Sequence, residues 1–428
     1  MTTRVLLSLF ALFSAFLPAC GADDASFGGD RQLAAGTTNQ TESSESGSDK
    51  NAQGGSGAAA PVAARGGASA GSSVAAPGAG AGSNYGLGSA PVTWNSAKTA
   101  TLDDAQLQSA YSTWKLAHVE ACANGSAVVV NGDAVVSEGI AYGMLLSVAM
   151  SDQALFDALF KYYQDHADKN GLMNWKTQKC EAPGNNNTNA ATDADLDAAM
   201  ALVQAAARWP SAPTGYLSKA ETLAAKIIQF ETDMCDGRRI LRPGDSFGGC
   251  SDTSYRRIIN PSYFSPGYYK VFAHYFSSQA ATWLALSDAS YQLYAFYQAH
   301  LGALVPDWSS PDGNPTELPN DGLYWYDACR TPWRVAVDYA WSGDTRAKTF
   351  MQNISSWVDA HGGLPKAAQQ QNSAFIGAFA LAGSYDQGKF DGYMSGWLGA
   401  KLDDTPYYQG TLRVLYLLVA AGKFSSTL

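Results

Sequence analysis

Three short stretches of the 428-residue chain place carboxylates where they could serve acid–base chemistry. In the first, SEGIAYGMLL, Glu138 opens an apolar segment. Burial among apolar groups raises the pKa of a carboxyl, which suits a proton donor near neutral pH. An acid that only stabilises a helix N-terminus, by about 0.3–1 kcal/mol, would also explain Glu138. It would not explain Gly139 and Gly143, which let another part of the chain or a ligand approach closely.

The second stretch is ATDADLD, in which Asp193, Asp195 and Asp197 alternate. An EF-hand loop would need glycine at its sixth position and an acid at its twelfth, and these are Ala198 and Gln204. On a helix, Asp193 and Asp197 share a face and Asp195 points elsewhere. Three acids in one turn repel each other, so we expect at least one to have a partner, such as an arginine or a ligand.

The third stretch, YWYDACRTPWR, sets Asp327 among aromatic residues and ahead of Arg330 and Arg334. Pro332 is placed to open a helix. A nearby arginine would hold the carboxyl ionised, as a general base or a ligand anchor. The alternative is a structural Arg–Asp pair covered by aromatic rings.

Two other kinds of site are disfavoured. The GDSFG sequence at 244–248 matches the GxSxG motif of ester hydrolases, but that motif needs a strand before it and a helix after it. Pro243 and Gly249 flank it instead and predict a loop. The chain has five His and no HExxH or paired CxxC, so we expect no metal site and no cofactor.

Helical periodicity dominates from about residue 100 onward, and only 127–130 has a clear strand pattern. Thr192 and Asp195 are spaced as a variant capping box. Twelve helices, some apolar all round and some amphipathic, predict an all-α fold, an (α/α)6 barrel of six inner and six outer helices. An open α-solenoid is the alternative, but no fixed-period repeat supports it. The twelve windows are 102–120, 137–150, 153–166, 192–209, 217–232, 265–277, 280–301, 332–341, 345–360, 372–384, 388–400 and 407–422.

The first 20 residues predict an export signal, with Arg4 before an apolar run that is too short to span a membrane. The run ends on Leu-Pro-Ala-Cys, which resembles a lipoprotein box and makes Cys20 a candidate for lipidation. The predicted destination is the cell surface or outer membrane, with ordinary secretion as the alternative. Either route takes the protein out of the cytoplasm, into a compartment in which disulfides persist.

Residues 21–90 predict a linker, and residues 91–428 a single catalytic domain. Gly, Ala and Ser fill 30 of the 40 positions from 51 to 90, so this segment cannot bury enough apolar area to fold alone. We expect a flexible tether between the possible anchor and the folded body.

If Cys20 is lipidated, five cysteines remain, so at least one thiol stays free. We favour a Cys235–Cys250 disulfide, with Cys122–Cys180 as a weaker second pair. That leaves Cys329 free and buried.

Composition excludes further classes. The formal net charge of −10 disfavours binding to nucleic acid through phosphate contacts. No internal stretch reaches 18 apolar residues, so the body is not a membrane bundle. Aromatic residues make up 12% of the chain, which leaves rings available for flat ligand surfaces.

Several motifs in register from about residue 100 to 422 resemble glycoside hydrolase family 8. The resemblance implies an (α/α)6 barrel that hydrolyses β-1,4-linked polysaccharides with inversion at the anomeric carbon. Inversion needs one protonated and one ionised carboxyl, about 6.5–9.5 Å apart. The matching stretches are SEGIAYGMLL, NGLMNWK, AATDADLDAAMAL, LRPGD, NPSYFSPGYYKVFA, ALVPDW, YDACRTPWRVAVDYAW and NSAFIGAFA.

By this resemblance Glu138 matches the general acid, Asp327 the general base, and Asp193 the acid that contacts the distorted sugar. An Asp in the Tyr-Asp-Ala motif fits the branch that includes cellulases and xylanases, whereas chitosanases tend to use another base. Phe247 stands at the cleft where cellulases commonly carry Trp, which leaves the subsite preference open. The other matching cleft positions are Trp175, Tyr263, Tyr326 and Arg330.

We therefore expect an exported, inverting, endo-acting glycoside hydrolase that cleaves β-1,4-glucan. Xylan, lichenan or chitosan are alternative substrates within the family. A sugar-binding lipoprotein without activity is the alternative from another class. The expected partner is the polysaccharide, with membrane contact only through the lipid anchor. We expect a monomer, although the sequence leaves the oligomeric state open.

Overall fold

The structure, a computed structural model, describes residues 94–426 except 124, 185–188, 253–256 and 317–321. The predicted export signal at 1–20, with Cys20, and the predicted linker at 21–90 lie outside the described residues.

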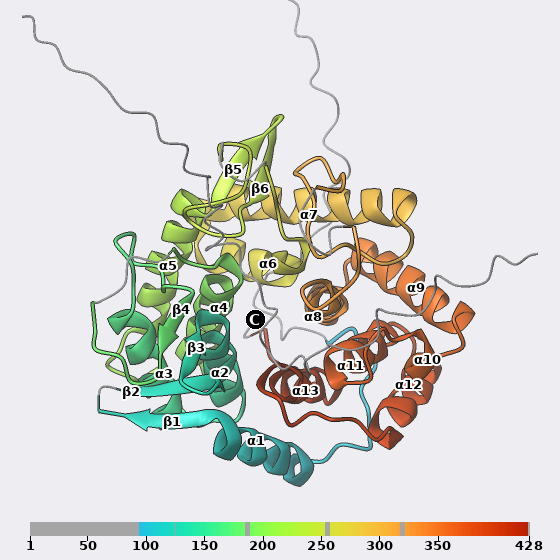
Figure 1. Ribbon diagram of the computed structural model, residues 1–428, viewed down its shortest axis with the longest axis horizontal. Coiled ribbons are helices and arrows are strands. Elements are labelled where there is room, and N and C mark those ends of the chain that lie inside the picture. Colours follow the sequence, from blue (N-terminus) through green and yellow to red (C-terminus); the bar gives the residue numbers. More distant parts are fainter. Residues whose placement is uncertain (1–93, 124, 185–188, 253–256, 317–321, 427–428) are drawn as a thin grey trace, which may run out of the picture. The chain divides into compact units, whose positions relative to one another are not determined.

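Six helices form a closed inner ring (Figure 1). Each contacts the next one along the chain, and the last contacts the first. The ring therefore closes, which an open solenoid would not do. Its members are α2 (Ser137–Ala149), α4 (Thr192–Arg208), α6 (Pro266–Tyr275), α8 (Thr331–Ser342), α11 (Ser373–Ala382) and α13 (Tyr407–Ala420).

Six further helices pack outside this ring; each packs against an inner helix, and α9 contacts two of them, α8 and α11. The predicted (α/α)6 barrel is confirmed, and all twelve predicted windows correspond to helices. The short α10 (Leu364–Ala367) was not predicted, because four residues carry too little periodicity. The outer helices are α1 (Asp104–His118), α3 (Gln153–Asp165), α5 (Tyr216–Phe230), α7 (Ala280–His300), α9 (Thr345–Ala360) and α12 (Gln387–Gly399).

The inner helices are apolar on nearly every side because other helices surround them. In α2, every residue from 137 to 148 is buried, and in α11 all ten are. A Cβ at Gly143 would lie 2.7 Å from the side chain of Leu159, and one at Gly139 would lie 3.1 Å from the Tyr407 hydroxyl. The two glycines therefore allow close packing of other parts of this chain, Leu159 and Tyr407, against α2.

Six short strands accompany the helices in the described part of the chain. β1 (Val119–Cys122), β2 (Gly125–Asn131), β3 (Ala134–Val136) and β4 (Lys176–Gln178) form an antiparallel sheet in that order. β5 (Thr232–Cys235) and β6 (Arg238–Leu241) form a hairpin. The predicted strand lies within β2. Because β3 runs directly into α2, the sheet fixes where the helix carrying Glu138 begins.

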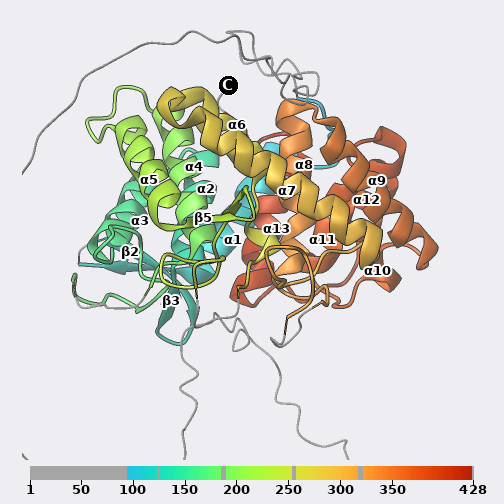
Figure 2. The same ribbon diagram turned by 90° about the horizontal axis from the view of Figure 1, so that it is seen from above.

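The irregular connections gather at one end of the barrel. Figure 2 shows β3 and the long connections before α6 and α8 on the same side. In the described parts of the connections there are three short 3₁₀ helices: η1 (Pro261–Tyr263), η2 (Ser277–Gln279) and η3 (Ala328–Arg330).

The cysteines pair as predicted. Cys122 is bonded to Cys180 and Cys235 to Cys250, and Cys329 is free and buried. The first bond ties β1 to the loop after β4, and the second ties β5 to the loop that follows β6.

One local prediction is wrong. The residue before α4 is Ala191, and no side chain caps this helix. The capping box expected from Thr192 does not form, because Asp195 points into the interior, where the Tyr163 hydroxyl donates to it. A capping box does begin α1, between Asp103 and Gln106.

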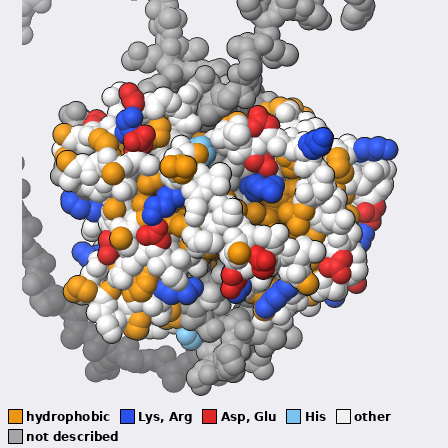
Figure 3. Space-filling view, turned by 90° about the horizontal axis from the view of Figure 1, so that it is seen from below, with side chains coloured by type: hydrophobic (Ala, Val, Ile, Leu, Met, Phe, Trp, Pro, Cys, Tyr) orange, Lys and Arg blue, Asp and Glu red, His pale blue; other side chains and the backbone are white. Residues whose placement is uncertain are grey.

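Within the described ranges, none of the helices combines the length and the hydropathy that a membrane span requires. On the face shown in Figure 3, acidic and basic side chains are interspersed, with apolar side chains between them.

Candidate active site

Arg330 joins the three predicted acids at one point. Its Nη1 donates to Glu138 Oε2 at 2.6 Å and to Asp193 Oδ2 at 2.7 Å. Its Nη2 donates to Asp327 Oδ1 at 2.7 Å and to Ser262 Oγ at 2.9 Å. The planar guanidinium presents five fixed donors, so it can hold several carboxyls at once.

The three acids come from the N-terminal ends of three inner-ring elements. Glu138 is the second residue of α2, Asp193 the second residue of α4, and Asp327 immediately precedes η3, which continues into α8. Helix N-termini favour negative charge, because their backbone N–H groups lack intrahelical partners. Residues 192 positions apart in the chain, Glu138 and Arg330, therefore meet at one end of the barrel.

Glu138 and Asp327 contact the same guanidinium, so they share one site. Two hydrogen bonds and the width of one guanidinium place their bound oxygens no more than about 8 Å apart. The Asp327 side chain is 25% exposed, while those of Glu138 and Asp193 are 6% and 0% exposed. Of the three carboxyls, that of Asp327 is therefore the most open to water.

One guanidinium cannot neutralise three carboxylates, so the site favours keeping a proton. The pKa of Glu138 is raised to about 7. Burial raises it most, and Asp193 and Asp327 also raise it, while Arg330 and a hydrogen bond from Tyr407 lower it. The pKa of Asp327 is also raised, because burial outweighs the lowering effect of Arg330. Arg330 thus favours the ionised form, as expected from the sequence, but its effect is smaller than that of burial.

The ATDADLD stretch is oriented as predicted. Asp193 faces Arg330, and Asp197 on the same face binds Arg334 through both carboxyl oxygens. Arg334 therefore pairs with Asp197, and among the described residues it forms no ion pair with Asp327. Asp195 points the other way, toward α3, where Tyr163 lies.

The predicted cleft residues lie around this group. The Tyr263 ring lies 5.3 Å from the Arg330 guanidinium, and its hydroxyl is buried without a hydrogen-bond partner in the described part of the chain. The Trp175 carbonyl accepts from the Ser137 N–H at 2.9 Å, which places it beside the start of α2. Tyr326 directly precedes Asp327.

Phe247 contributes differently. It is 4% exposed and forms a small apolar cluster with Ile258 and Trp308. Trp308 in turn lies beside Asp327 and lowers its pKa. The GDSFG sequence is a loop, as predicted, which removes the structural context of an ester hydrolase.

Sequence reasoning missed three residues at the site. The Tyr407 hydroxyl donates to Glu138 Oε1 at 2.9 Å. Ser262 accepts from Arg330 and donates to Asn260 Oδ1 at 2.6 Å. Asp307 Oδ1 accepts from the backbone of the segment that carries Asp327. The ALVPDW and NPSYF motifs contain Asp307 and Ser262, but no local pattern marks Tyr407.

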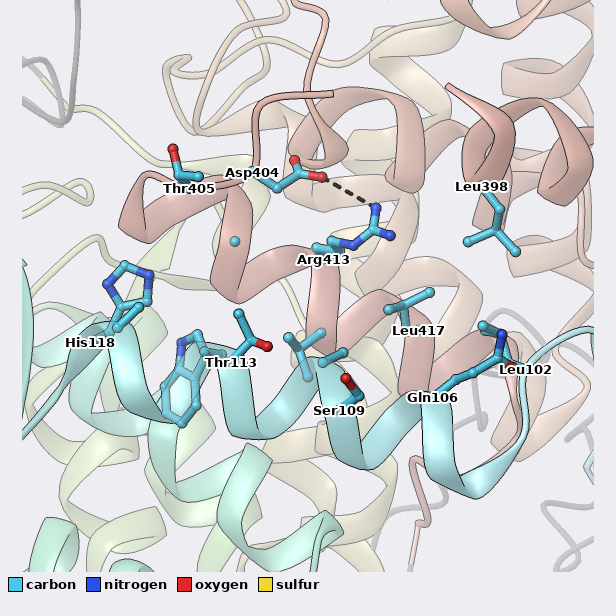
Figure 4. Close-up of a pocket in the computed structure, with 15 residues that line it drawn as sticks. Leu102, Gln106, Ser109, Thr113, His118, Leu398, Asp404, Thr405, Arg413 and Leu417 are labelled. Carbon is cyan, nitrogen blue, oxygen red and sulfur yellow. Dashed lines mark hydrogen bonds and ion pairs between the residues drawn. The ribbon is translucent and has the colours of Figure 1, made fainter. Parts of the chain in front are cut away.

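A separate pocket of about 610 Å³ lies between α1 and α13. Figure 4 shows Asp404 and Arg413 joined by an ion pair on the side of the pocket opposite α1, with His118 toward one end. None of the three acids lines this pocket. The Tyr407 ring touches His118 edge-on, so one residue separates the pocket from Glu138.

The sequence model of the family glycosyl hydrolases family 8 matches residues 89–421 of this chain. Endoglucanase A of Acetivibrio thermocellus is 34% identical over 352 residues, covering 76% of this chain and 70% of that protein. Endoglucanase 2 of Ruminiclostridium josui is 32% identical over 338 residues, covering 74% and 71%.

Solved structures agree on the fold. A β-1,3-1,4-glucanase from Paenibacillus sp. X4 superposes with a TM-score of 0.68 at 25% identity, covering 78% of this chain and 96% of that one. A xylanase from Teredinibacter turnerae superposes with a TM-score of 0.64 at 19% identity, covering 76% and 95%, and supports the fold alone. The chain belongs to glycosyl hydrolases family 8, a family of inverting glycoside hydrolases.

Proposed function

We propose that the protein is an exported, endo-acting hydrolase of β-1,4-linked glucan. The observation that carries this proposal is that Glu138, Asp193 and Asp327 converge on Arg330. Endoglucanases from two Ruminiclostridium species, 31% and 32% identical to this chain, support the glucan substrate.

Glu138 protonates the glycosidic oxygen as the bond breaks. A carboxyl with a pKa of about 7 still carries its proton in a large fraction of molecules at neutral pH. Its two oxygens face Arg330 and Tyr407, so the site fixes the direction in which the proton is presented.

Asp327 activates the attacking water. Its exposure gives water access that the other two acids lack. Arg330 contacts both carboxyls, so the difference between them lies in exposure: the Asp327 side chain is 25% exposed and that of Glu138 is 6% exposed, and such different surroundings separate the roles of two carboxyls. Water attacks the face of the sugar opposite the leaving group, so one displacement inverts the anomeric carbon.

Asp193 and the aromatic residues hold the sugar. Asp193 is fully buried and bound to Arg330, so its carboxyl stays in place as the ring distorts. The unpartnered Tyr263 hydroxyl is available to a sugar hydroxyl or to the attacking water. Trp175 and Tyr326 are partly exposed and offer flat faces to pyranose C–H groups. Phe247 is buried against Trp308, which lies beside Asp327, so it supports the site through this contact.

The test is hydrolysis of carboxymethylcellulose, lichenan, xylan and chitosan by the purified chain, with proton NMR of the first product. We expect the highest rate on carboxymethylcellulose and the α-anomer first. Glu138→Gln and Asp327→Asn should each lose activity by about 10²–10⁴-fold. A β-anomer as the first product would contradict the roles given to Glu138 and Asp327.

Mixed-linkage glucan is the second candidate substrate. The β-1,3-1,4-glucanase of similar fold is 25% identical, and a "Beta-glucanase" of Niallia circulans is 29% identical. A higher kcat/KM on lichenan than on carboxymethylcellulose would favour it. Binding of cello-oligosaccharides without turnover on any of the four polymers would favour a sugar-binding protein instead.

Export and lipidation of Cys20 complete the proposal. The two disulfides of the barrel support an oxidising compartment. Labelling of cells with a radioactive fatty acid should mark the wild-type protein and leave Cys20→Ala unlabelled. Label on both proteins, or on neither, would contradict acylation at Cys20.

A further inference from the structure

Asp307 holds the turn that carries Asp327. It lies in the connection between α7 and η3 and is only 3% exposed. Its Oδ1 accepts hydrogen bonds from the backbone N–H groups of Trp325, at 2.9 Å, and Ala328, at 2.7 Å. Its own N–H donates to the carbonyl oxygen of Leu323 at 2.8 Å. One residue therefore binds the turn on both sides of Asp327.

Asp307 is itself fixed to the barrel wall. Two residues on, Ser309 exchanges backbone hydrogen bonds of 2.8 and 3.1 Å with Ile259, which leads into η1. The Ser309 hydroxyl also meets the Tyr297 hydroxyl of α7 at 2.7 Å. Because the hydrogen bonds of Ser309 to Ile259 and Tyr297 are buried, they hold Asp307 in place. Asp307 can therefore determine the position of the turn.

The neighbours of Asp307 act on Asp327 as well. Trp308 and Asn260 lie beside the Asp327 carboxyl and lower its pKa. Burial and the nearby Asp327 raise the pKa of Asp307 to about 8, against the two backbone N–H groups and Arg330. At neutral pH Asp307 is therefore mostly protonated, and what it supplies to the turn is an acceptor oxygen.

We propose that Asp307 is a positioning residue for the general base, which sets the place of Asp327 through the N–H groups of Trp325 and Ala328. The inference rests on the proposed function, because it takes Asp327 to be the base. A group that must direct a water onto one carbon depends on its position, and a displacement of about 1 Å can cost about 10²-fold in rate.

Two substitutions separate this role from general support of the fold. Asp307→Asn keeps a carbonyl oxygen at the position of Oδ1 and so accepts both hydrogen bonds. We expect its kcat to stay within about threefold of wild type. Asp307→Ala removes the acceptor, and we expect kcat to fall by about 10–100-fold with KM nearly unchanged. KM stays because Asp327 acts after the substrate has bound.

The matched control is Asp312→Ala, in the same connection. Asp312 is exposed and its carboxyl meets only Ser310 and Asn314 among the contacts resolved. Its kcat should equal that of wild type. Circular dichroism and binding of cellotetraose by calorimetry establish the folded, binding-competent fraction of each variant, so that kcat is expressed per folded molecule.

The proposal is overturned if folded Asp307→Ala keeps a kcat within threefold of wild type, or if only its KM changes. Should Asp307→Ala fail to fold, Asp307→Asn decides alone. A folded Asn variant that loses more than tenfold in kcat contradicts the acceptor role, and one that keeps its kcat supports it.

Failure of this inference differs from failure of the proposed function. If wild-type protein hydrolyses no glycan, or Asp327→Asn is as active as wild type, the base assignment itself is wrong. If Asp327→Asn is inactive and Asp307→Ala is not, only the positioning role is wrong.

Discussion

The hydroxyl of Tyr407 donates a 2.9 Å hydrogen bond to Oε1 of Glu138, across the point where α13 meets α2 and closes the inner ring. This bond stabilises the carboxylate form and lowers the pKa of Glu138, against the larger effect of burial.

Tyr407→Phe should therefore raise the pKa of Glu138. A hydrogen bond to a charged group contributes about 1.5–3 kcal/mol, so we expect the alkaline limb of kcat/KM to move up by about one pH unit. The measurement is a pH–rate profile on a soluble glucan. Tyr393→Phe is the control, because its hydroxyl meets Ser355 and Asp359 on α9. An alkaline limb that stays in place or moves down would contradict the role of this bond.

The wild-type profile should be bell-shaped. Glu138 must hold its proton, so activity is lost as pH rises through about 7. Asp327 must be ionised, so activity is lost as pH falls through its raised pKa. In Glu138→Gln the residual activity should lack the alkaline limb, and aryl glycosides with good leaving groups should lose much less than polysaccharide does. An alkaline limb that persists in Glu138→Gln would assign it to another group.

Replacement of Arg330 should lower activity or stability even when the new side chain keeps the charge or the size of arginine. Lysine keeps the charge but presents no planar fork, so Arg330→Lys should lower kcat by about 10²-fold through misplacement of the acids. Arg330→Met leaves three carboxyls without their cation, and loss of one partner of a buried pair costs about 3–5 kcal/mol.

The loss in Arg330→Met should be smaller at pH 5 than at pH 7.5, because Glu138 and Asp327, whose pKa values are raised, then carry protons more often and need a cation less. Urea unfolding at both values measures it. The control for Arg330→Lys is Arg346→Lys, which makes the same substitution at a half-exposed ion pair with Asp344 and Asp288. Its kcat should match that of wild type. A loss that is equal at both pH values would show that packing, and not charge, explains the effect.

The sequence allowed the three acids to be predicted because each stands in a local pattern. Glu138 and Asp193 precede runs that fold as buried helices, and Asp327 precedes an arginine within one turn. Their meeting point was predicted only through the family resemblance, since no short-range pattern places α2 next to η3.

Tyr407 and Asp307 could not be found in the same way. Tyr407 is 269 residues from Glu138 and reaches it only because the ring closes. Asp307 acts through backbone N–H groups, which leave no trace in the residue types of the turn it holds. The effect of burial on the pKa of Asp327 could not be predicted for a related reason, because an arginine three residues away is visible in the sequence and the depth of burial is not.

Glu231, which follows the last residue of α5, gives a prediction about stability. Its carboxyl is fully buried and lies against Asp195, and burial followed by Asp195 raises its pKa well above the usual value. Burial likewise raises the pKa of Asp195 to about 7. Two carboxyls in contact share a proton, because both cannot ionise without mutual repulsion.

In the unfolded chain glutamate releases its proton near pH 4.3, while in the folded chain Glu231 still holds it. Its contribution to stability is therefore complete below about pH 4.3 and is lost as pH rises toward the folded pKa, at up to about 1.4 kcal/mol per pH unit. Glu231→Gln cannot ionise, so its free energy of unfolding should fall less steeply between pH 5.5 and 7.5 than that of wild type. Urea unfolding with the disulfides intact gives both slopes, and Glu221→Gln, exposed on α5, should keep the wild-type slope. Equal slopes for wild type and Glu231→Gln would mean that Glu231 releases its proton at the same pH in both states, and that Asp195 does not share it.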